Sequence, residues 1–210
     1  KIHYPIAIRS SSLLEDSQYQ PLSGMYATYM LPNINKDDNV RFNLLCDAIK
    51  RVYASTFYKE AAALIESSIH ALEEEKMAVV IMELVGQTSE NRFYPTFSGT
   101  AQSFNYYPVS YMHRNEGVAF VALGLGRTVA AGEKSLRFSP EYPTILPQYY
   151  SIKATLASSQ NSFYALNLNN GENPLRDGEP SNLEQLHLKD AEKHGSLKFT
   201  ASVICDEDNI

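Results

Sequence analysis

The segment Arg9–Ser12 places one guanidinium and three hydroxyl groups directly after a short apolar run. A guanidinium carries a rigid fork of hydrogen-bond donors that fits phosphate oxygens, and serine hydroxyls and backbone amides can add further donors. The segment is therefore a candidate phosphate-binding turn. The alternative interpretation is a surface turn with an ordinary charge, because Arg-Ser pairs are common in proteins.

Two further segments have residue types and spacing that are suited to binding a nucleotide. Gly124-Leu125-Gly126 follows an apolar run, as a phosphate-binding loop at the start of a helix does. It lacks the third glycine of the dinucleotide fingerprint, so a tight turn is the alternative. Met77–Val85 is apolar except for Glu83 and could face a flat base. Its alternative is a central strand that is buried on both faces.

The remaining candidates favour no hydrolase and no metal centre. The five histidines show no HxxxH or HExxH spacing. His187 and His194 could share one helical face, where two solvent-facing histidines are the simpler interpretation. There is no GxSxG segment, which argues against a Ser-His-Asp hydrolase. A carbohydrate-binding module would rest only on the 14 tyrosines.

Hydrophobic periodicity predicts the elements that position these residues. Strands are expected at Ile6–Ile8, Met25–Leu31, Met77–Val85, Arg92–Tyr107 (one or two strands), Gly117–Leu125, Ser162–Leu168 and Leu197–Cys205. Helices are expected after the N-cap candidates Asp37 and Asp38, at Lys59–Glu75, Thr128–Ala131 and Asn182–Lys193. Glu15, Asp16 and Ser17 are interpreted as a polar loop. Helices and strands without a strict βαβ rhythm favour an α+β fold.

Composition limits the class of protein. The net charge of −6 argues against general binding to nucleic acid or to an anionic membrane, which both need a basic face. No apolar run reaches the roughly 20 residues that span a bilayer. Two cysteines, Cys46 and Cys205, form no disulfide framework, so we expect a reducing, cytoplasmic setting.

Taken together, several segments resemble the N-terminal ATP-binding domain of the phosphoenolpyruvate synthase and pyruvate phosphate dikinase family. The matching segments, in the order in which the family has them, are Ile8–Ser17, Pro21–Tyr26, Met77–Val85, Ser98–Ala101 and Gly124–Gly132. Residues 133–210 match less clearly. Five ordered segments are far more specific than any one of them.

The resemblance implies an ATP-grasp-like α+β fold, with mostly antiparallel sheets, flanking helices and ATP between two lobes. Residues 1–210 are then one partial domain, with lobes at about 1–75 and 76–210. In the whole enzymes of the family, ATP phosphorylates a histidine on a separate domain, and a third domain passes the phosphate to pyruvate. The implied cofactors are ATP and Mg²⁺, and the implied partners are those domains of the same polypeptide. Homodimerisation is left open.

By position, the resemblance also implies roles for individual residues. Arg9 would be the catalytic clamp on the phosphates. The nucleotide contacts would be Gly24 and Met25 over the phosphates, the backbone of Glu83, Leu84 and Val85 at adenine, Ser103 at a phosphate, and Arg127 and Thr128 at the ribose.

The chain also departs from the family pattern. Met82 replaces a glutamine in the adenine strand, Arg127 replaces a glutamate, and Asn105–Pro108 replaces a short turn. These changes suggest a divergent branch or, alternatively, a non-catalytic regulatory or scaffold module. The family's phosphate-binding lysine, its metal-binding element and its Thr-Cys-His segment have no match in the chain. We therefore expect a fragment that does not turn over alone.

Overall fold

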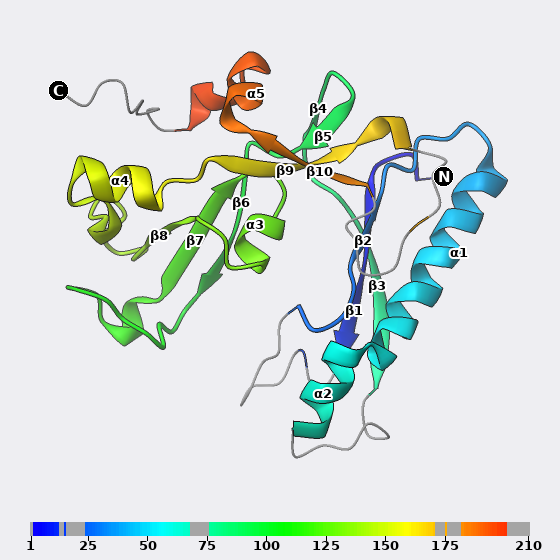
Figure 1. Ribbon diagram of the computed structural model, residues 1–210, viewed down its shortest axis with the longest axis horizontal. Helices are drawn as coiled ribbons and strands as arrows, with labels where there is room; N and C mark the ends of the chain where they lie inside the picture. The colour runs from blue at the N-terminus through cyan, green and yellow to red at the C-terminus, as the bar shows by residue number, and fades with distance from the viewer. Residues whose placement is uncertain are drawn as a thin grey trace. The chain divides into compact units, whose positions relative to one another are not determined.

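The computed structural model describes residues 2–12, 15, 24–67, 76–170, 175 and 182–200. Its strands are β1 Ile6–Ser12, β2 Tyr29–Leu31, β3 Met77–Glu83, β4 Gln87–Ser89, β5 Arg92–Tyr94, β6 Phe97–Gln102, β7 Val118–Leu123, β8 Leu136–Phe138, β9 Ser162–Asn167 and β10 Leu183–His187 (Figure 1). Its helices are α1 Asp38–Ala54, α2 Lys59–Ser67, α3 Arg127–Ala130, α4 Ile152–Ser158 and α5 Leu188–Lys193. The registers that the structure gives are antiparallel. The mixed α+β class with antiparallel sheets is therefore confirmed.

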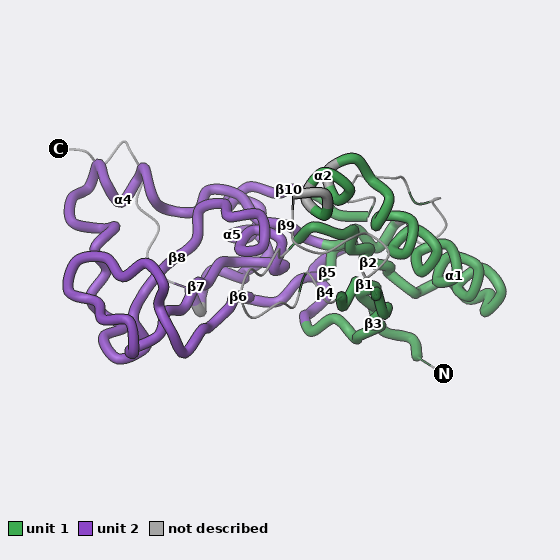
Figure 2. The backbone as a smooth tube through the Cα atoms, turned by 90° about the horizontal axis from the view of Figure 1, so that it is seen from below, with its two compact units in different colours: residues 1–85, 91–93, 166–184 green, residues 86–90, 94–165, 185–210 purple. Residues whose placement is uncertain are grey.

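The chain divides into two units that interleave along the sequence (Figure 2). The first comprises residues 1–85, 91–93 and 166–184, and the second comprises residues 86–90, 94–165 and 185–210. A further sheet has four strands in the order β10-β9-β5-β4. The lobe boundary expected near residue 75 stays a prediction.

In the first unit, β1 is the middle strand of a sheet with the order β2-β1-β3. Helix α1 packs against one face of this sheet, where Ile6 and Ile8 of β1 meet Ala48 and Val52 of α1. Alternate residues of a strand point to opposite faces. Ala7, Arg9 and Ser11 of β1 therefore belong to the other face.

Helix α1 begins where local chemistry predicts. The Asp37 side chain accepts a hydrogen bond of 2.8 Å from the backbone N–H of Asn39. This bond satisfies one of the donors that the first turn of a helix leaves unpaired. The N-cap prediction is confirmed.

In the second unit, β7 is the middle strand of a sheet with the order β6-β7-β8. Phe120 of β7 lies opposite Thr100 on one side and Arg137 on the other. Gly99 of β6 is required by close approach, because a Cβ there would lie 2.2 Å from the carbonyl oxygen of Phe120. This close contact excludes a larger residue at position 99 unless the backbone shifts.

Several sequence-based predictions are wrong. Strand β3 is not buried on both faces, since Val80, Ile81 and Met82 are 38%, 45% and 47% exposed. Residues 182–193 are not one helix but β10 followed by α5. The spacing of the leucines there fits the period of a helix as well as that of a strand. Residues Leu183–His187 form a strand because they pair within the four-stranded sheet.

Other boundaries changed as well. Of the strand expected at Met25–Leu31, only Tyr29–Leu31 is extended and paired. The described start of the strand expected at Leu197–Cys205 is a 3₁₀ turn at Ser196–Phe199. Helix α2 is described as far as Ser67, and the rest of its expected length lies outside the described residues. Strands β4 and β8 and helix α4 were not predicted.

Candidate functional site

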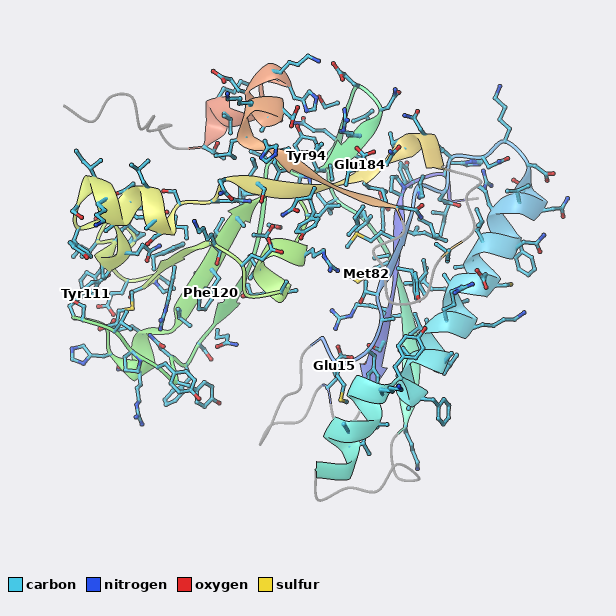
Figure 3. The ribbon with its side chains drawn as sticks, viewed as in Figure 1. Glu15, Met82, Tyr94, Tyr111, Phe120 and Glu184 are labelled. Carbon is cyan, nitrogen blue, oxygen red and sulfur yellow. The ribbon has the colours of Figure 1, made fainter. Side chains whose placement is uncertain are left out.

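Arg9 lies on the face of the first sheet that α1 does not cover. Its neighbour Ile8 is fully buried in the core beneath α1, whereas Arg9 is exposed. The Cα of Arg9 lies opposite that of Val80, and Ala7 lies opposite Met82. These pairs share one face of the sheet, so Arg9 lies beside the partly exposed side chains of Val80 and Met82. Figure 3 labels Met82 on β3.

The Arg9 guanidinium has a defined internal contact. Its Nε donates a hydrogen bond of 3.2 Å to the carbonyl oxygen of Ser10. No acidic side chain among the described residues forms an ion pair with it. The two Nη groups can therefore present a fork of donors to an anion.

The backbone beyond β3 offers polar groups at the predicted adenine position. The N–H of Leu84 donates to the carbonyl oxygen of Pro5 at 2.9 Å and is therefore already used. Because backbone groups alternate in direction along a strand, those of Glu83 and Val85 point to the opposite edge of β3. No strand of the described residues pairs with that edge.

The register sets the spacing between these two features. Glu83 and Val85 are three and five residues beyond Val80, the partner of Arg9. At about 3.4 Å per residue they lie roughly 10–17 Å along the strand from the arginine. That range is of the order of the length of an extended nucleoside triphosphate. The first sheet can thus present donors to the phosphates from the face that carries Arg9, and backbone groups to the base from the free edge of β3.

The sequence analysis missed Glu15. It expected Arg9–Ser12 to form a turn whose serine hydroxyls face a phosphate, but these residues continue strand β1. The Ser10 hydroxyl donates a hydrogen bond of 2.6 Å to Oε2 of Glu15, and both side chains are buried. The signal available in the sequence was the spacing of alternate serines followed by a carboxylate. It was interpreted as a polar loop because nothing local distinguishes a buried glutamate from an exposed one.

Gly24 and Met25 precede β2 in the chain. Gly24 has a φ of 81°, in the left-handed region where a side chain causes strain. Met25 is half-buried. Residues 16–23, which precede them, lie outside the described residues. A position of both residues over the phosphates stays a prediction.

In the second unit, the Gly124–Gly126 segment forms the tight turn between β7 and α3. Gly124 has a φ of 81°, and a Cβ there would lie 2.8 Å from both the Phe163 ring and the Tyr164 carbonyl oxygen. The N–H of Leu125 donates to the same carbonyl at 2.9 Å. These contacts explain the glycine at position 124 without a ligand.

The predicted ribose contacts follow this turn. The Arg127 guanidinium lies 5.3 Å from the centre of the Tyr164 ring, whose hydroxyl donates to Glu133 at 2.8 Å. Thr128 is only 1% exposed, and its hydroxyl has no partner among the described residues. Arg127 is thus the more accessible of the two. Ser103 is exposed directly after β6. The nucleotide roles of all three stay predictions.

The histidine interpretation is wrong for His194. Its side chain is 3% exposed, and Nδ1 lies 2.8 Å from the hydroxyl of Tyr94. His187 instead ends β10 and is the N-cap residue of α5. Within the described parts of the chain, no three His, Cys, Asp or Glu side chains are grouped to hold a metal ion. The described residues thus offer no ligand set for Mg²⁺.

Comparison with known families shows which family the chain belongs to. A family model described as pyruvate phosphate dikinase, AMP/ATP-binding domain, matches residues 1–200. The chain belongs to this family. The resemblance of the ordered motifs is therefore confirmed, and with it an ATP-grasp-type, ATP-binding domain. A search of curated proteins found no match. None of the helices in the described ranges is long and apolar enough to span a bilayer.

Proposed function

We propose that this chain is the ATP-binding part of a phosphotransferase that phosphorylates a histidine on a separate domain of the same polypeptide. The phosphoryl group then passes from that histidine to pyruvate. Family membership supplies ATP as the ligand class. The observation that carries the proposal is the register of β1 and β3, which sets Arg9 opposite Val80 and a nucleotide's length from Val85.

In this proposal Arg9 binds and orients the phosphates. Its Nε donates to the Ser10 carbonyl oxygen, and this bond leaves the two Nη groups for phosphate oxygens. Charge-assisted, forked hydrogen bonds to phosphate oxygens are stronger than neutral ones. The transfer breaks a P–O bond of ATP and forms a P–N bond on the acceptor imidazole. A guanidinium favours this step by stabilising negative charge on the transferred group.

The apolar side chains of β3 supply the surface for the base. Val80 and Met82 are partly exposed on the face that carries Arg9. An adenine ring that covers Met82, two residues beyond the partner of Arg9, removes apolar area from water, worth about 25 cal/mol per Å². Main-chain groups of Glu83 and Val85 are available for the ring edge, while Leu84 contributes its side chain and not its N–H.

A second candidate function is a non-catalytic relative with a degenerate nucleotide site. It is favoured by Met82, whose thioether cannot donate a hydrogen bond as glutamine does. It is also favoured by Arg127, which replaces a potential acceptor for ribose hydroxyls.

Titration calorimetry with ATP and Mg²⁺ on the full-length protein separates the two. The first function predicts measurable binding that Arg9→Ala weakens by about 1.5–3 kcal/mol, or roughly ten- to a hundredfold. Arg51→Ala is the matched control, because Arg51 lies on α1 and pairs with Asp47 at 2.9 Å. Equal loss in both variants, or no binding by the wild type, would reject the first function.

A further inference from the structure

A buried carboxylate is fastened to β1 next to the exposed arginine. Glu15 is 8% exposed, and its Oε2 accepts the 2.6 Å hydrogen bond from Ser10. Its backbone N–H donates to Oγ of Ser12 at 3.1 Å. Two hydrogen bonds therefore tie Glu15 to alternate residues of one strand. Burial of a carboxylate is costly unless it is well bonded, so this contact is not an incidental surface turn.

The two serines and Arg9 point to opposite faces of the sheet. Ser10 and Ser12 are buried like Ile8, on the face beneath α1, whereas Arg9 is exposed. The carboxylate of Glu15 is therefore bound to β1 without neutralising the guanidinium. The charge of the Arg9 guanidinium can therefore bind an anionic ligand. The contacts of Glu15 hold the C-terminal end of β1 in place.

Ser10 connects the carboxylate to the arginine. Its hydroxyl is held by Glu15, and its carbonyl oxygen accepts the 3.2 Å hydrogen bond from Nε of Arg9. Rotation of the Ser10 peptide would move the acceptor that fixes the guanidinium plane. The path from Glu15 to the guanidinium thus runs through one residue and two hydrogen bonds.

We propose that Glu15 is a positioning residue for Arg9, holding Ser10 so that the guanidinium fork is oriented toward the phosphate chain of a nucleotide. The inference rests on the proposed function and adds a residue to it. Glu15 touches no ligand. Its effect is selective for the anionic end of the nucleotide, because the base and the sugar do not depend on Arg9.

The test is a double-mutant cycle on the full-length protein, with the dissociation constant of ATP and Mg²⁺ measured for the wild type, Arg9→Ala, Glu15→Ala and the double variant. We expect Glu15→Ala alone to weaken ATP binding about tenfold, but to add less than about twofold once Arg9 is absent. Glu15→Gln, whose amide oxygen still accepts from Ser10, should keep most of the affinity. Adenosine, measured by saturation-transfer NMR, should bind equally to the wild type and to Glu15→Ala.

Each outcome is decisive. Equal losses in the presence and in the absence of Arg9, or a matching loss for adenosine, would make Glu15 only structural and overturn the inference. If Glu15→Ala does not fold, Ser10→Ala removes the same hydrogen bond with a small side chain, and the same coupling to Arg9 is required of it. If Arg9→Ala leaves ATP binding unchanged, the proposed function itself has failed, and the inference fails with it.

Discussion

The hydroxyl of Tyr94 lies 2.8 Å from Nδ1 of His194, deep inside the second unit. The same hydroxyl lies 2.7 Å from Oγ of Ser196, and Tyr94 is fully buried. Glu90 completes the group, with its Oε2 3.8 Å from Nε2 of His194. Polar contacts of Tyr94 therefore hold the segment after α5 against strand β5, in addition to apolar packing.

Tyr94→Phe should destabilise the protein by about 1–3 kcal/mol, because it leaves two buried polar partners without a hydrogen bond. The ring contact with Phe163, at 5.0 Å between centroids, is retained. Urea unfolding measures the loss. Tyr106→Phe is the control, since Tyr106 is 62% exposed, and it should change stability by less than about 0.5 kcal/mol. Equal effects of the two substitutions would contradict the role of the buried hydroxyl.

Gly99→Ala should destabilise the second unit by steric overlap. A Cβ at this position meets backbone, the carbonyl oxygen of Phe120, which cannot turn away as a side chain can. Overpacking of this kind costs about 1–3 kcal/mol. At Gly126 the atom nearest to a Cβ would be Oγ of Ser98 at 3.9 Å, so Gly126→Ala is a matched control. Thermal unfolding of the two variants compares them, and similar midpoints would show that β6 can shift.

The parts of the fold that could be predicted from the sequence were those determined by interactions within a short segment. The side chain of Asp37 and the apolar spacing after it were sufficient to place the start of α1, because an N-cap bond and a helix face are properties of a short segment. The exposure of β3 was not predictable in the same way. An apolar run reports a strand, but whether Val80 and Met82 are covered depends on how many layers pack against the sheet.

The candidate site shows the same division. Arg9 was identified from its chemistry and from the resemblance, and its place opposite Val80 gives the prediction a geometry. The burial of Glu15 could not be found from sequence, because its two hydrogen bonds depend on the loop that returns it to β1. His194 was misjudged for a similar reason, since its partner Tyr94 is 100 residues away in the chain.

The pKa of Tyr164 should be raised above its ordinary value of about 10, first by burial and then by the hydrogen bond to Glu133. Folding then favours the protonated phenol. The resulting stability is present below the unfolded pKa and is lost as the pH rises through the folded pKa. Titration of phenolate absorbance should show Glu133→Gln lowering this pKa. Arg127→Ala should raise it, because Arg127 opposes the shift. A Tyr164 pKa that responds to neither substitution would argue against these contacts.

Arg127→Glu tests whether the chain's departure from the family pattern weakens its nucleotide site. In the family pattern, this position is a glutamate that accepts hydrogen bonds from ribose hydroxyls, whereas an arginine can only donate. If the site binds ATP through this position, the substitution should tighten ATP binding several-fold, because each hydrogen bond to a charged group contributes about 1.5–3 kcal/mol before other costs. The effect should be smaller for a 2′,3′-dideoxy analogue of ATP, which lacks the ribose hydroxyls.

Arg127→Gln provides the control for that experiment. It also removes the cation over the Tyr164 ring but introduces no carboxylate. Affinity that rises equally in both variants would mean that the arginine repels or obstructs the nucleotide. Affinity that rises only with glutamate, and only for ATP with an intact ribose, supports a sugar contact at this turn. No change in either variant would remove residue 127 from the site and leave recognition to the β1–β3 face that carries Arg9.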